Sequence, residues 1–130
     1  MIEKFQPRIK VKICGTTSLK DAFLAVESGA DAIGFIFYKM SPRNISQKEA
    51  KEIILQLPPF IETVGVFVNE TSDKINRIAE QCKLNSIQLH GEESPALCRR
   101  VKRKVIKAFR VKNCPVNTSD AADGPWCCHS

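Results

Sequence analysis

Residues 11–17 read VKICGTT: a short β-branched run ends at Cys14, and a glycine and two threonines follow. This run predicts a strand, and the alternation of charged and aliphatic residues extends it back to Arg8. At the end of a strand, Cys14 would face the cleft of the fold, and Gly15 would let a ligand approach the backbone closely. A lone cysteine at a strand end is more often a small buried apolar residue, so this stretch by itself identifies no site.

The same pattern recurs along the chain. Four further runs are strand-like, at residues 31–37, 62–68, 86–89 and 105–111. Four segments between the strands carry apolar residues at helical spacing and begin after Ser18, Ser46, Thr71 or Ser72, and Ser94. Apolar strands that alternate with amphipathic helices predict an α/β fold with a parallel sheet. Both an open doubly wound sheet and a closed eightfold barrel fit, although no G-x-G-x-x-G motif follows the first strand.

Composition narrows the class of protein. A length of 130 residues fits one domain, and no apolar run reaches the length that spans a membrane. The start of the chain lacks the apolar core of a signal peptide, so we expect a cytoplasmic protein with no membrane partner. The six cysteines do not have the paired spacing of a zinc site or a disulfide framework, so we expect reduced thiols.

The net charge of +6 is unevenly distributed. All 20 lysines and arginines precede residue 113, and eight of them lie in residues 99–112. A basic patch can mark a nucleic-acid-binding protein, but Phe109 is the one aromatic residue in this run that could stack on a base. We therefore interpret the run as a solvated surface and expect no nucleic-acid partner.

Polar residues gather where the predicted strands end. They are Cys14, residues 38–43, Asn69, Gln88, His90 and Arg110. In a parallel sheet covered by helices, functional groups belong at the carboxyl ends of the strands. Lys12 lies two residues before Cys14 and hence on the same face of its strand, where an ammonium group would favour the thiolate. The alternative for Lys12 is a charge that reaches solvent from a strand edge.

Two of these residues have side chains suited to binding. Arg43 follows an apolar strand, and its guanidinium could hold a carboxylate or a phosphate through two hydrogen bonds. The alternative is an ordinary surface arginine. His90 could donate to a substrate or carry a proton, or it could instead bond a loop carbonyl for structural reasons. Phe35, Phe37, Phe67 and Phe109 are interpreted as core residues.

Five motifs in this order and spacing resemble the phosphoribosylanthranilate isomerase family of tryptophan biosynthesis. They are KICG at residues 12–15, GADAIGFIF at 29–37, SPR at 41–43, VGVFVN at 64–69 and QLHG at 88–91. The resemblance implies a (β/α)-barrel, which decides between the two architectures. It also implies an Amadori rearrangement of N-(5-phosphoribosyl)anthranilate, a small-molecule substrate, and neither cofactor nor metal.

The resemblance assigns roles to three residues. Cys14 matches the family's general base, Arg43 the arginine that holds the anthranilate carboxylate, and His90 a histidine that lines the pocket. The family's general acid is an aspartate that ends the sixth strand, and this aspartate has no counterpart in the five strands of this chain. The phosphate-binding loops after the seventh and eighth strands also lack a counterpart.

We therefore expect residues 1–112 to form a partial (β/α)-barrel of about five strands and four helices. Residues 113–130, which contain no Lys or Arg and no capped helix pattern, are expected to be an irregular or disordered tail. Five strands do not close an eight-stranded barrel, so we expect a truncated, inactive isomerase whose open sheet edges favour self-association. The alternative is a non-catalytic half-barrel that persists only by association with another half-barrel.

Overall fold

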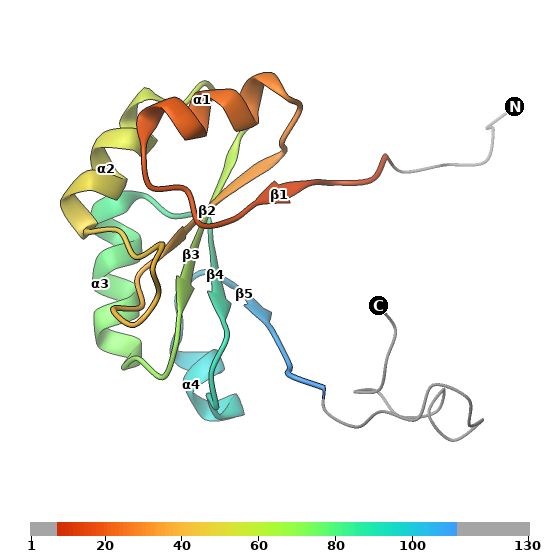
Figure 1. Ribbon diagram of the computed structural model, residues 1–130. Coiled ribbons are helices and arrows are strands. Elements are labelled where there is room, and N and C mark those ends of the chain that lie inside the picture. The colour runs from red at the N-terminus through yellow and green to blue at the C-terminus, as the bar shows by residue number, and fades with distance from the viewer. Residues whose placement is uncertain (1–7, 112–130) are drawn as a thin grey trace, which may run out of the picture.

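A computed structural model describes residues 8–111 of the chain (Figure 1). Strands and helices alternate from β1 to β5. In chain order they are β1 (Lys12–Ile13), α1 (Leu19–Glu27), β2 (Ala32–Ile36), α2 (Gln47–Gln56), β3 (Glu62–Phe67), α3 (Ser72–Cys82), β4 (Ser86–Leu89), α4 (Pro95–Arg100) and β5 (Lys104–Lys107). The predicted domain boundary at residue 112 and the predicted tail lie outside the described residues.

The helices begin where the sequence predicts. Ser18, Ser46, Thr71 and Ser94 each accept a hydrogen bond from the backbone N–H three residues later, as N-cap residues do. The Ser46 cap is reinforced by Glu49, whose carboxylate accepts from the Ser46 N–H and completes a capping box. Local sequence therefore fixes the start of each helix.

The five strands form one parallel sheet in the order β1-β2-β3-β4-β5. An open doubly wound sheet would change direction at a switch point in the strand order, and this sheet does not. The sequential order is that of a barrel, as predicted. Within residues 8–111, β1 pairs only with β2 and β5 only with β4, so each has one edge without a partner strand.

The helices pack on one face of the sheet, and the two core clusters lie between helices and strands (Figure 1). One cluster joins α1 and α2 to Ile33 and Phe35 of β2, and the other joins α3 and α4 to β3 and β4. The rings of Phe37 and Phe67 stack with their centroids 5.2 Å apart. Apolar residues on alternate strand positions thus hold the helices to the sheet.

The opposite face of the sheet is concave. The Lys12 ammonium group of β1 donates a hydrogen bond to the Gln88 side chain of β4, although two strands separate them in the sheet. Such a contact requires the sheet to curl, as it does in the wall of a barrel. The α/β barrel-type architecture with five strands and four helices is therefore confirmed for the described residues.

The ends of the sheet differ from the prediction. The first strand, predicted to extend back to Arg8, is only the two residues of β1, and Ile9 is 82% exposed. Directly before β1, the Asp31 carboxylate accepts the Val11 N–H at 2.8 Å and binds the Arg8 guanidinium, while the Val11 carbonyl accepts from the backbone N–H groups of Asp31 and Ala32. The fifth strand ends at Lys107, and Phe109 is 55% exposed, so the assignment of Phe109 to the core was wrong.

No helix within residues 8–111 has the length and apolar character to cross a membrane.

Candidate functional site

The carboxyl ends of all five strands lie at one edge of the sheet, because the strands are parallel. Cys14 follows β1, the loop with Arg43 follows β2, Asn69 follows β3, and His90 follows β4. The polar residues that the sequence analysis selected therefore belong to neighbouring loops. We call this edge the carboxyl rim.

Cys14 is half-buried and lies against β2. A Cβ atom added at Gly34 would lie 2.9 Å from the Cys14 Sγ, so only a glycine leaves room for this side chain. The N–H groups of Gly15 and Thr16 both donate to the Gly34 carbonyl at 3.1 Å. Gly15 has φ +83°, a conformation that favours glycine. These contacts fix the backbone directly after Cys14.

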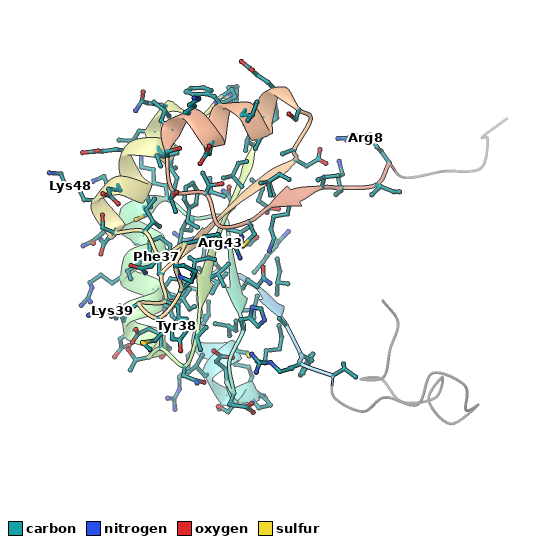
Figure 2. The ribbon with its side chains drawn as sticks, viewed as in Figure 1. Arg8, Phe37, Tyr38, Lys39, Arg43 and Lys48 are labelled. Carbon is teal, nitrogen blue, oxygen red and sulfur yellow. The ribbon has the colours of Figure 1, made fainter. Side chains whose placement is uncertain are left out.

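Arg43, labelled in Figure 2, lies across Gly15 and against the backbone of Cys14. Its Nη1 donates to the Cys14 carbonyl at 3.2 Å, and a Cβ at Gly15 would lie 2.6 Å from the same nitrogen. The loop is held to β2 by Asn44 and Ile45, which both donate to the Ile36 carbonyl. Two of the predicted site residues, which are 29 positions apart in the chain, are therefore in contact.

Lys12 shares the concave face with Cys14, as the parity of the strand predicts. Lys12 is half-buried, and its ammonium group donates a hydrogen bond to the Gln88 side chain. The described contacts of this ammonium do not include the thiol. Support of a Cys14 thiolate by Lys12 therefore stays a prediction.

His90 is exposed at the carboxyl rim, directly after β4. Its backbone N–H donates to the Phe67 carbonyl at 3.0 Å, which ties the end of β4 to the end of β3. The exposed imidazole is accessible to a ligand bound over the rim. Its role in binding stays a prediction.

Glu93, which the sequence analysis missed, joins the loops after β3 and β4 to the end of β5. Its fully buried carboxylate accepts from the Asn69 N–H at 2.8 Å, from the Gly91 N–H at 2.9 Å and from the Lys107 Nζ at 2.7 Å. Lys107 also donates to the Gly91 carbonyl at 2.5 Å. Burial opposes ionisation of Glu93, but the Lys107 ammonium and these N–H groups together hold the pKa of the carboxyl below its ordinary value of 4.5.

This network anchors the segments around His90. Asn69 has φ +50°, and its side-chain Oδ1 accepts from the Glu92 N–H at 2.8 Å, so the loops after β3 and β4 are bonded to each other twice. The sequence signal was weak, because an acidic residue four positions after a strand is normally a surface residue. The partner of this buried carboxylate, Lys107, lies 14 positions later in the chain, so the local sequence does not indicate the burial of Glu93.

Within residues 8–111, no group of three or more His, Cys, Asp or Glu side chains lies close enough together to hold a metal ion. The groups that the described rim offers are instead a thiol, a guanidinium and an imidazole. The Arg43 guanidinium is bonded to the backbone of Cys14, so a carboxylate bound by this guanidinium would lie near the end of β1.

Comparison with known proteins identifies close relatives. A family model described as N-(5'-phosphoribosyl)anthranilate (PRA) isomerase matches residues 11–125. The N-(5'-phosphoribosyl)anthranilate isomerase of Trichlorobacter lovleyi is 55% identical over 105 residues, which are 81% of this chain and 51% of that protein. The enzyme of the same name from Pelobacter propionicus is 58% identical over 105 residues, 81% of this chain and 50% of that protein. The chain spans about half the length of the curated relatives it matches.

Solved structures agree with these relatives. The crystal structure of phosphoribosyl anthranilate isomerase from Thermotoga maritima superposes with a TM-score of 0.76 at 53% identity, over 77% of this chain and 50% of that one. A crystal structure of such an isomerase in complex with reduced 1-(o-carboxyphenylamino)-1-deoxyribulose 5-phosphate superposes with a TM-score of 0.80 at 53% identity. It covers 82% of this chain and 56% of that chain.

Proposed function

Because the chain belongs to the N-(5'-phosphoribosyl)anthranilate isomerase family, we propose that it supplies the first half of an isomerase barrel in tryptophan biosynthesis. The reaction is the Amadori rearrangement of N-(5-phosphoribosyl)anthranilate to 1-(2-carboxyphenylamino)-1-deoxyribulose 5-phosphate. The proposal includes a cytoplasmic location, a small-molecule substrate, and neither cofactor, metal nor nucleic acid. The name of the relatives and the residues of the carboxyl rim support it.

The contact between Arg43 and Cys14 carries this proposal. In the substrate, only a few covalent bonds separate the anthranilate carboxylate from the C2′ carbon that loses its proton. A residue that binds the carboxylate and a base that takes the C2′ proton must therefore be neighbours. The Arg43 Nη1 lies 3.2 Å from the Cys14 carbonyl, so the guanidinium and the thiol belong to adjoining parts of the rim.

The proposed chemistry has two proton transfers between enzyme and substrate, followed by a tautomerisation. A general acid protonates the ribose ring oxygen. The bond from C1′ to this oxygen then breaks, and the N-glycoside opens to a Schiff base. The Cys14 thiolate then removes the C2′ proton, and the electron pair of the C–H bond forms the enolamine. The enol loses its hydroxyl proton and C1′ gains one, which gives the aminoketose. Arg43 holds the carboxylate during these steps, His90 lines the pocket, and Lys12 favours the Cys14 thiolate.

Half of this machinery is expected outside residues 8–111. The resemblance places the general acid on a sixth strand and the phosphate loops after the seventh and eighth, whereas the described sheet has five strands. We therefore propose that the polypeptide alone does not turn over the substrate and that it becomes active when the second half of a family barrel is added.

The test compares turnover by the purified polypeptide with turnover after co-expression with the second half of the Trichlorobacter lovleyi relative. We expect activity only in the assembled form, and a loss of about 10²–10⁴-fold in kcat for Cys14→Ala, the range for a general base. Cys98→Ala is the matched control, because Cys98 is also half-buried but lies on α4. Turnover that survives Cys14→Ala would refute the assigned base, and turnover by the polypeptide alone would refute the need for a second half.

A further inference from the structure

Within residues 8–111, no carboxylate pairs with the Lys12 ammonium group on the concave face of the sheet. The ion pairs there use other basic residues, namely Arg8, Lys74, Arg103 and Lys107. The Lys12 ammonium instead donates a hydrogen bond to the side-chain oxygen of Gln88, and both residues are half-buried. Because the amide is neutral, this contact fixes the position of the ammonium group without cancelling its charge.

Glu62 is an acidic residue on the same face of the sheet. It pairs in register with Ala32, and Ala32 pairs with Lys12, so the three side chains point to one side. The Glu62 carboxylate accepts a hydrogen bond from the Ser86 hydroxyl at 3.0 Å and forms no ion pair with Lys12. The described part of the concave face therefore keeps a positive charge at Lys12.

Lys12 and Gln88 each lie two positions before a residue of the carboxyl rim. Cys14 follows Lys12, and His90 follows Gln88, so in each case the two side chains point to the same face of the sheet. The extended pairing continues past the end of β4, because the His90 N–H donates to the Phe67 carbonyl at 3.0 Å. Two residues of a strand span about 6.6 Å. The contact between Lys12 and Gln88 therefore lies one layer of side chains below Cys14 and His90.

We propose that Gln88 is a positioning residue, which holds the Lys12 ammonium group below the Cys14 thiol as a positive charge that attracts anionic ligands. Gln88 acts through Lys12 and does not itself contact the substrate. Without this acceptor, the long lysine side chain would turn its strongly hydrated ammonium group to water. The ligand class is an anion, such as a carboxylate or a phosphate. The inference rests on the proposed function only for the catalytic role of Cys14.

The experiment compares two alkylating reagents that differ in charge, iodoacetate and iodoacetamide. Both react with the same Cys14 thiolate, so the ratio of their rate constants reports the charge near the thiol and is independent of the fraction of thiolate. The polypeptide is labelled by itself at low salt, and each cysteine is followed by peptide mapping. For Lys12→Met we expect the ratio at Cys14 to fall about threefold, the effect of one unit charge at about 7 Å in a dielectric close to that of water.

Gln88→Met removes the acceptor oxygen and keeps the length of the side chain. It should lower the ratio at Cys14 nearly as far as Lys12→Met does. When the two substitutions are combined, the ratio should equal that of Lys12→Met alone, because Gln88 acts through the lysine. Gln88→Ala gives the same expected result with a smaller side chain, and urea denaturation shows which of the two variants is folded.

Two variants serve as matched controls. Lys10→Met removes the same charge from an exposed lysine about 13 Å from Cys14 along the strand, and it should change the ratio less than about 1.5-fold. Gln81→Met removes a similar hydrogen bond, which joins Gln81 of α3 to Gln47 of α2, and it should leave the ratio unchanged. The ratio at Cys98 of α4 should be the same in every variant.

Three results would overturn the proposal. They are an unchanged ratio at Cys14 in the folded Gln88 variants, an equal fall in Gln81→Met, and a further fall when Gln88→Met is added to Lys12→Met. Turnover by an assembled isomerase that lacks the Cys14 thiol would contradict the proposed function instead, and it would leave the placement of the Lys12 charge intact.

Discussion

Replacement of Glu93 by glutamine tests whether the buried carboxylate holds the carboxyl rim together. Glutamine has the shape of glutamate and keeps one acceptor oxygen, but it cannot neutralise the Lys107 ammonium, which is only 18% exposed. Removal of one partner of a buried ion pair costs about 3–5 kcal/mol. Because Lys107 retains some contact with solvent, we expect the lower end of this range, about 3 kcal/mol of the free energy of unfolding.

This loss is large beside the whole stability of a domain, which is about 5–15 kcal/mol. Urea denaturation of Glu93→Gln and of Glu92→Gln measures it, because Glu92 is adjacent in sequence but exposed. We expect a change within about 0.5 kcal/mol for Glu92→Gln, as for other surface substitutions. Equal stabilities of the two variants would refute the interpretation of Glu93 as the residue that joins the loops.

The NMR signal of the His90 ring separates a local change at the carboxyl rim from the overall loss of stability in Glu93→Gln. Glu93 fixes the Gly91 N–H, which follows His90 directly, so loss of the carboxylate should alter the surroundings of the imidazole. The chain has two histidines, so the NMR signal of the His90 ring can be assigned with one His129→Gln variant. We expect this signal to shift in Glu93→Gln and to stay in place in Glu92→Gln.

The pH dependence of stability has a defined sign. The pKa of the Glu93 carboxyl is lower in the folded protein than its ordinary value of 4.5, so its contribution to stability is complete above that value. It is lost as the pH falls through the lowered pKa, because the protonated carboxyl no longer pairs with Lys107. Wild-type stability should therefore decline more steeply below about pH 5 than that of Glu93→Gln, and the two should converge. Parallel profiles would contradict this assignment.

Two further predictions concern the cysteines. Gly34→Ala should destabilise the fold by about 1–3 kcal/mol in urea denaturation, because the new Cβ would lie 2.9 Å from the Cys14 Sγ. The same variant should change the alkylation rate of Cys14. A loss of stability under about 0.5 kcal/mol with unchanged alkylation would count against this contact. Cys82 should be alkylated by iodoacetamide more slowly than Cys14 and Cys98 in peptide mapping, since burial raises the pKa of its thiol and leaves it 1% exposed. Labelling of Cys82 as fast as that of the half-buried Cys14 would show that this part of the core opens readily.

The helices show how far local sequence determines this fold. The apolar residues that recur at helical spacing in α3 are all buried: Ile75, Ile78, Ala79 and Cys82. Helix starts and core-facing positions depend on residues three or four apart, so a single stretch of sequence contains the whole signal. The strand ends were less predictable: β1 is only two residues long, and directly before it the Val11 N–H donates to the Asp31 carboxylate.

The sequence predicted which residues belong to the candidate site, but it did not predict the contacts between them. Cys14, Arg43 and His90 could be selected because each follows an apolar run, and a parallel sheet brings such positions to one edge. The arrangement of Arg43 over Gly15 was not predictable, because it depends on how the loop after β2 folds back over β1. Glu93 was missed for the same reason, since its partner Lys107 lies on the neighbouring strand.

The sequence by itself determined the alternation of strands and helices, the helix caps and the family motifs, because these depend on neighbours along the chain. The tertiary structure alone decided the contact of Lys12 with Gln88 and the burial of Glu93. These features depend on the curl of the sheet and on which strand has a neighbour. Both are set by packing between residues far apart in sequence, so no local pattern of residue types specifies them.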